Sequence, residues 1–172
     1  MTRILTDAEI MELLTERKRL PQGWRSQLEP KRKSDTRYAQ KTIKVIGDAA
    51  HEFALTVRTS VDFLTDFSVI LSLVENGHEY NLVRHNGNHK ADHTNTIEKR
   101  QGLPNSILRN AFHIHQATQR YQESGRSIDS YAEATSLYNT LDGALDLMVS
   151  SYGFVIEAAA TFLPLFDVDD KK

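Results

Sequence analysis

Residues 38–84 constrain the fold more than any other part of the chain. Four runs of β-branched or alternating apolar residues are separated by turn residues, including Gly47-Asp48 and Asn76-Gly77, and Asn-Gly is a strong signal for a two-residue hairpin. The runs are residues 42–46, 51–59, 67–74 and 80–84. Because sequential strands joined by short turns usually pair with one another, the sequence predicts an antiparallel meander over residues 38–84.

A helix is predicted before the meander, over residues 5–19. Thr6 and Glu9 have the spacing of a capping box, in which each side chain bonds to the other residue's backbone N–H. Pro21 disfavours helical geometry at the residue before it, so the helix is expected to end there. Residues 21–37 then predict a basic loop that packs locally through Trp24 and Leu28.

The part after the meander is predicted to be mostly helical, over residues 109–166. A second capping-box pattern at residues 130–133 predicts a helix that continues through Tyr138. Apolar residues then recur at helical spacing between positions 141 and 163, with Gly153 as a break. Acidic residues interrupt this apolar stretch, which favours a core helix over a membrane span.

Together these patterns predict one α+β domain covering residues 1–172. It would contain an N-terminal helix, a four- or five-stranded antiparallel meander and two or three C-terminal helices over one face of the sheet. A length of 172 residues with 40% hydrophobic residues is enough for one core. The chain has no cysteine, which excludes disulfides and thiolate metal sites, and its N-terminus lacks an uninterrupted apolar stretch. We therefore expect a cytoplasmic protein without membrane contact.

The histidines are the one compositional anomaly. Six of the seven fall between His78 and His115. Three of them lie in residues 85–108, a stretch with little periodicity that is expected to form a long loop, and long loops in compact domains tend to be functional or disordered. The next two belong to residues 112–115, which read either as a fifth strand or as the first turn of a helix.

A metal site is one interpretation of this cluster. His85, His89 and His93 are spaced by four residues and would align on a helix, with Asp92 as a further ligand. The intervening residues 86–88, Asn-Gly-Asn, are poor helix formers, and the spacing matches no established zinc motif. No metal or cofactor is therefore expected.

Acid–base chemistry on RNA is the favoured interpretation. Histidine titrates near neutrality, so one ring can accept the nucleophile's proton while another protonates the leaving oxygen, and arginine can hold the phosphate. The candidate acid–base residues are His89, His113 and His115. The candidates for binding phosphate or orienting the substrate are Arg84, Asn86, Asn95, Arg120 and Tyr121.

Two other interpretations remain open. The histidines can be surface or hydrogen-bonded structural residues, which for any single histidine is the more common case. Alternatively, the loop and the acidic C-terminal part recognise a protein partner without turnover, since residues 127–172 hold eight acidic residues against two basic ones. In that case the partner would be a cognate antitoxin, another protein or a second copy of the chain in a homodimer.

The chain resembles an uncharacterised bacterial protein family with two sequence elements. Arg84, Asn86, Gly87 and His89, with Asn95 after them, match an Arg-x-Asn-Gly-x-His element, and residues 113–121 match His-Ile-His-x-Ala-Thr-x-Arg-Tyr. The resemblance implies a shared fold without an activity. A looser similarity to toxins of bacterial toxin-antitoxin pairs, which look like ribonucleases, implies a metal-independent ribonuclease-like toxin of a toxin-antitoxin or phage-defence system.

Overall fold

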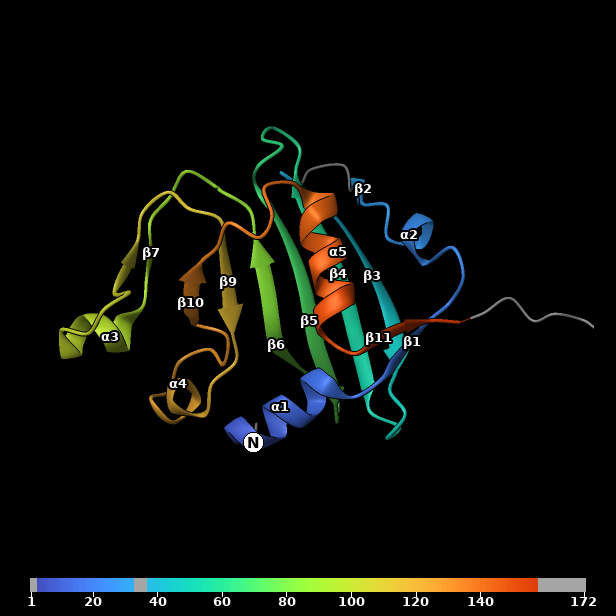
Figure 1. Ribbon diagram of the computed structural model, residues 1–172, viewed down its shortest axis with the longest axis horizontal. Helices are drawn as coiled ribbons and strands as arrows, with labels where there is room; N and C mark the ends of the chain where they lie inside the picture. The colour runs from blue at the N-terminus through green and yellow to red at the C-terminus, as the bar shows by residue number, and fades with distance from the viewer. Residues whose placement is uncertain (1–2, 33–36, 158–172) are drawn as a thin grey trace, which may run out of the picture.

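A seven-stranded antiparallel sheet forms the centre of the protein (Figure 1). The computed structural model describes residues 3–32 and 37–157. In spatial order the strands are β10 (Tyr131–Ala134), β9 (His113–Gln116), β6 (His78–Asn86), β5 (Phe67–Glu75), β4 (Glu52–Ser60), β3 (Tyr38–Ile46) and β2 (Lys31–Arg32). The predicted meander is confirmed in β3 to β6, and β2, β9 and β10 extend the sheet at its two edges.

The turn between β5 and β6 follows directly from its two residues. Asn76 has a φ of 51° and Gly77 a φ of 77°, so both occupy the left-handed region that the tightest hairpin turns require. Two smaller pairs lie outside the main sheet. β1 (Lys18–Leu20) runs parallel to β11 (Phe154–Ile156), and β7 (His93–Thr94) is antiparallel to β8 (Ile107–Leu108).

Five helices accompany the strands within the described residues. They are α1 (Asp7–Thr15), α2 (Trp24–Gln27), α3 (Thr96–Gln101), α4 (Gln119–Glu123) and α5 (Leu141–Ser151). α5 crosses one face of the sheet and packs against β5 and β6, while α1 lies below the strand ends (Figure 1). The core lies between α5 and the sheet, where the buried side chains include Val69, Leu71, Ala144, Leu145 and Met148. None of the described helices is long and apolar enough to span a membrane.

The N-terminal helix begins as predicted but ends earlier. Thr6 and Glu9 form the capping box. The helix stops at Thr15 instead of continuing to residue 19, because Lys18 is drawn into the core. Its ammonium donates to the carbonyl oxygens of Leu13, at 2.7 Å, and Glu16, at 2.8 Å, and so satisfies carbonyls that a longer helix would use.

The prediction of a helix over residues 130–138 is wrong. Residues 131–134 form β10, the edge strand that pairs with β9. Tertiary pairing overrides the local pattern here, because β9 offers a free edge to this short segment. α5 begins at Leu141 as expected and ends before Gly153, whose φ of 71° breaks the helix. The remainder of the predicted helix, from residue 158 onward, lies outside the described residues.

Residues 85–108 are not an irregular loop. The first two complete β6, and the rest contain β7, α3 and β8, which are joined by short irregular segments and project together from the sheet (Figure 1). The alternatives for residues 112–115 are also decided. This segment leads into strand β9, and a separate short helix, α4, follows from Gln119.

Candidate functional site: a histidine cluster beside an arginine cleft

The register between β6 and β9 gathers the polar residues on one face of the sheet. Arg84 lies opposite His115, and Asn86 lies opposite His113. Side chains alternate between the two faces of a strand, so these four share a face, and His85 points the other way. His85 is buried beneath α5, where its Nδ1–H donates to the carbonyl oxygen of Ala144 at 3.0 Å.

Three histidines converge on this polar face. One ring nitrogen each from His93, His113 and His115 can be chosen so that all three atoms lie within 4.8 Å of one another. The ring centroids of His93 and His115 are 4.7 Å apart, and those of His113 and His115 are 4.9 Å apart. His89 extends the group, because its ring lies edge-on to that of His113 with 5.4 Å between centroids.

Each ring of the triad is held by a hydrogen bond from one of its nitrogens. Nδ1–H of His113 donates to the carbonyl oxygen of Ala111 at 2.7 Å, and Nδ1–H of His115 donates to that of Asp129 at 2.8 Å. Nε2–H of His93 donates to Oδ1 of Asn95 at 3.0 Å. A carbonyl oxygen can only accept, so these bonds fix the tautomers. They leave the lone pair of a neutral ring on Nε2 of His113 and His115 and on Nδ1 of His93.

The triad is neutral near pH 7. Burial lowers the pKa of His115 to about 2 and that of His113 to about 4, and the nearby Arg84 charge acts in the same direction. Burial also lowers the pKa of His93, against the opposing effect of its bond to Asn95. The side chains of His113 and His115 are 1% and 4% exposed. Neutral, fixed and buried imidazoles are suited to coordinate a metal, and less suited to donate a proton at neutral pH.

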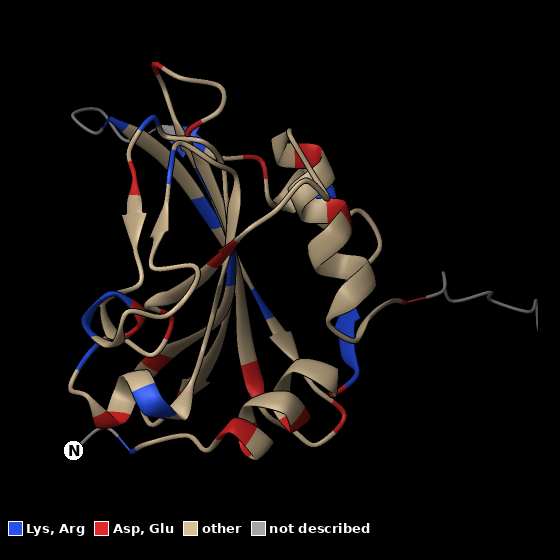
Figure 2. Cartoon of the chain, turned by 60° about the vertical axis from the view of Figure 1, so that its left-hand side comes forward, with Lys and Arg blue, Asp and Glu red and all other residues tan. Residues whose placement is uncertain are grey.

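An arginine-lined cleft of about 380 Å³ lies next to the histidines. Its lining includes Arg37, Arg58 and Arg84 together with Asn86 and the exposed His89. Figure 2 shows Lys and Arg segments gathered toward the upper end of the sheet, with acidic residues at the adjacent strand connection. The cleft is thus an open, cationic surface backed by the buried triad.

The three arginines differ in their partners. Arg84 pairs with the buried carboxylate of Asp129 at 3.2 Å, and its Nε is a buried donor without a hydrogen-bond partner among the described residues. The guanidinium of Arg58 lies 3.8 Å from the centre of the Tyr38 ring. Within residues 3–32 and 37–157, neither Arg37 nor Arg58 forms an ion pair with a carboxylate. Two positive charges of the cleft therefore have no carboxylate partner among the residues that the structure describes.

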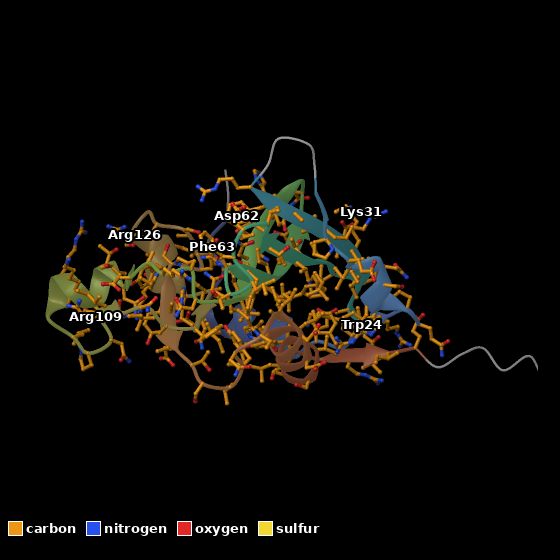
Figure 3. All side chains as sticks on the ribbon, turned by 90° about the horizontal axis from the view of Figure 1, so that it is seen from above. Trp24, Lys31, Asp62, Phe63, Arg109 and Arg126 are labelled. Atoms are coloured by element: carbon orange, nitrogen blue, oxygen red, sulfur yellow. The ribbon has the colours of Figure 1, made fainter. Side chains whose placement is uncertain are left out.

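Aromatic side chains flank the same cleft. Tyr38 and Phe63 contribute to its lining, and Phe63 is 46% exposed. Figure 3 looks down on this end of the sheet and shows Asp62 and Phe63 on the side away from α5, whereas Arg109 lies out on the β7–α3–β8 projection. An exposed ring such as Phe63 beside cationic side chains is a usual component of a surface that binds single-stranded nucleic acid.

The predicted site residues separate into two groups. His89, His113, His115, Arg84 and Asn86 lie together as described above. Asn95 is buried beside the triad, where it bonds to His93, whereas Arg120 and Tyr121 lie elsewhere and make structural bonds.

Arg120 and Tyr121 both bind Glu98, which is 3% exposed. Arg120 forms an ion pair with this carboxylate, and the hydroxyl of Tyr121 donates to it at 2.5 Å. The pair fastens α4 to α3. The phosphate-binding role of Arg120 and Tyr121 stays a prediction, although both side chains already bind the carboxylate of Glu98.

Asn95 is fully buried and joins the projection to the edge strand. Its amide nitrogen donates to the carbonyl oxygens of Asn105 and Ala132, each at 2.7 Å, and its oxygen accepts from Ala132 N–H at 2.9 Å. The side chain therefore bonds to β10 as a neighbouring strand would. Through its bond to His93 it also orients the triad.

The sequence patterns did not assign three residues of this region to the site. His93 was considered as a metal ligand, but together with His85, which faces the opposite side of the sheet. Arg37 was interpreted as part of a solvated basic loop, and Arg58 was not considered. The alternation in residues 51–59 places Arg58 on the face opposite the core, and this was the signal that was available.

No protein-family model, curated protein or solved structure matches this chain. The resemblance to the bacterial family and to toxins therefore stays a prediction, and function has to be argued from the site itself.

Proposed function

We propose that the protein is a ribonuclease-like enzyme that binds single-stranded RNA in the arginine cleft. The observation that carries this proposal is the presence of Arg37 and Arg58, neither of which forms an ion pair with a carboxylate among the described residues, in a cleft that also holds an exposed imidazole, His89. Arginine binds phosphate in a bidentate fashion, and a guanidinium placed where charge develops stabilises the transition state.

The roles within the cleft follow from exposure and bonding. Arg37 and Arg58 would hold the RNA phosphates, and the exposed ring of Phe63 would stack on a base. A phosphate oxygen would give the unpartnered Nε of Arg84 an acceptor, which removes a cost of about 1–3 kcal/mol for a buried unsatisfied donor.

His89 is the best-placed candidate for proton transfer. It is the one histidine that lines the cleft, whereas His113 and His115 are buried behind it. Cleavage by the ribose 2′-hydroxyl would need a base to take its proton and an acid to protonate the leaving oxygen. His89 is proposed for one of these steps. We also propose that the protein acts as a toxin in a toxin-antitoxin or phage-defence system. The growth experiment in cells, described below, tests this proposal.

The test uses purified protein with a single-stranded RNA and a DNA of the same sequence. We expect the RNA alone to be cleaved, leaving ends with a 2′,3′-cyclic phosphate. Arg58→Ala should weaken RNA binding about tenfold and lower the salt dependence by roughly 0.7 in log–log slope, the value for one phosphate contact to a single strand. His89→Ala should abolish cleavage and leave RNA binding in place.

Arg17→Ala is the matched control. Arg17 is 65% exposed and lies near Asp48, at the opposite end of the nine-residue strands β3 and β4 from the cleft. Arg17→Ala removes one positive charge, as Arg58→Ala does, but leaves the cleft unchanged. If all variants bind RNA equally and RNA stays intact, the proposal is wrong. In cells, induced wild type should arrest growth and degrade RNA, and a folded His89→Ala variant should not.

A non-enzymatic, protein-binding module is the second candidate function, and one observation favours it. A mainly apolar groove of about 400 Å³ lies between α1 and the residues around Tyr152, and Met11 at its edge is 61% exposed. Exposed apolar surface of this kind marks interaction sites. Met11→Asp should then remove partner binding, for example in a titration with a candidate antitoxin, while leaving RNA chemistry unchanged.

A further inference from the structure

We infer that His93, His113 and His115 form a site for a divalent transition-metal ion of the zinc class, with the fourth coordination position toward His89 and the cleft. One nitrogen from each ring already lies within 4.8 Å of the other two. This inference goes beyond the proposed function, because the metal site stands whether or not the cleft cleaves RNA.

The distances between the three ring nitrogens are close to those in a site that holds a zinc ion. Zn–N bonds of about 2.0–2.1 Å in a tetrahedral arrangement place ligand nitrogens about 3.3 Å apart. The present spread of up to 4.8 Å closes to that value with ring movements of about 1 Å, which are within side-chain adjustment. Two of the three ligands sit on strand β9 and the third on the short strand β7, so coordination requires adjustment of side chains from only two strands.

The hydrogen bonds around the triad are those of a metal centre. Metal-ligating histidines characteristically donate the second ring N–H to a carbonyl or carboxylate oxygen, which fixes the tautomer and the ring orientation. All three rings do so, to Ala111, Asp129 and Asn95. The amide of Asn86 contacts Nε2 of His113 at only 3.4 Å, a weak bond that a metal ion would replace.

The ligand chemistry decides the class of ion. Three imidazole nitrogens suit zinc, cobalt, nickel or copper, whereas magnesium and calcium prefer oxygen ligands. Arg84 is the nearest cation, and the carboxylate of Asp129 offsets its charge. Three protein ligands with one position open to a cleft is the arrangement that bound metals use to hold water or a substrate oxygen.

The open position faces the proposed substrate. His89 lies against His113 and also lines the arginine cleft, so it marks the path between the ion and the cleft. His89 or a water molecule would complete the coordination in the absence of a ligand. A phosphate held by the arginines would lie beside the ion.

The experiment is a titration of the chelator-treated full chain with Co²⁺, followed through its visible d–d absorption, and then displacement by Zn²⁺ with the bound metal counted by mass spectrometry. We expect one metal ion per chain. His113→Gln, His115→Gln and His93→Ala should each weaken binding about 100-fold or more, since each removes a ligand instead of the outer partner that costs 10–100-fold. His78→Ala, at an exposed histidine outside the cluster, should bind as the wild type does.

His93→Ala is the ligand variant that is expected to stay folded, because His93 is half-buried and its replacement leaves the core intact. Zn²⁺ should raise the melting temperature of the wild type and of His78→Ala, and leave that of His93→Ala unchanged. Stoichiometric binding that persists in the folded ligand variants, or no binding by the wild type, overturns the inference. Arg58→Ala should keep the metal, so loss of RNA binding and loss of metal are separable.

Discussion

The buried amide of Asn95 gives the sharpest prediction. Its nitrogen faces two carbonyl oxygens at 2.7 Å, those of Asn105 and Ala132, while its oxygen accepts from Ala132 N–H and His93 Nε2–H. Asn95→Ala removes all four hydrogen bonds and leaves buried backbone groups without partners. Each such group costs about 1–3 kcal/mol, so we expect the free energy of unfolding to fall by about 2–4 kcal/mol. Asn95→Asp keeps the shape and is expected to be worse, because an oxygen then faces both carbonyls and a charge is buried.

Urea unfolding at pH 7.5 measures these differences. We expect stability to fall from wild type to Asn95→Ala and then by at least about 1 kcal/mol more to Asn95→Asp. Lowering the pH to 5 should narrow the gap between wild type and Asn95→Asp, because the introduced carboxyl group becomes neutral. Asn139→Asp, at an exposed asparagine, is the control and should change little. An Asn95→Asp protein as stable as the wild type would refute the bonding argued here.

Three further predictions follow from the same region. Tyr138→Phe should cost about 1–2 kcal/mol in urea unfolding, because the hydroxyl bridges the carbonyl oxygens of Asn86, at 3.0 Å, and His113, at 2.9 Å, and an unchanged midpoint would argue against the bridge. Gly87→Ala should cost about 2–3 kcal/mol by thermal unfolding, since a Cβ there would lie 2.0 Å from a backbone oxygen, and a neutral result would contradict that close approach. The metal-free protein should lose stability as the pH falls from about 6.5 toward 4. Burial lowers the pKa of His85 and takes that of His113 to about 4, so the unfolded chain binds protons first, and His113 alone accounts for about 2 kcal/mol at pH 5. Equal urea midpoints at pH 7.5 and pH 5 would show that these rings are not buried in neutral form.

The sequence determined the elements that depend on neighbouring residues. The Asn76-Gly77 turn and the alternation on either side of it predicted β5 and β6, and the Thr6–Glu9 capping box predicted where α1 begins. The sequence placed His113 and His115 on one face only on condition that their segment is a strand, which it left open. All of these features depend on interactions within a few positions along the chain.

The tertiary structure alone decided how the site is assembled. The same capping-box pattern at residues 130–133 led to a strand, because pairing with β9 outweighed local preference. The register of β6 against β9 placed Arg84 and Asn86 beside the two histidines and turned His85 to the other face. His93 joined them because the buried amide of Asn95 fastens its segment to β10. These contacts join residues far apart in sequence, and local patterns carry no information about which distant strands will meet.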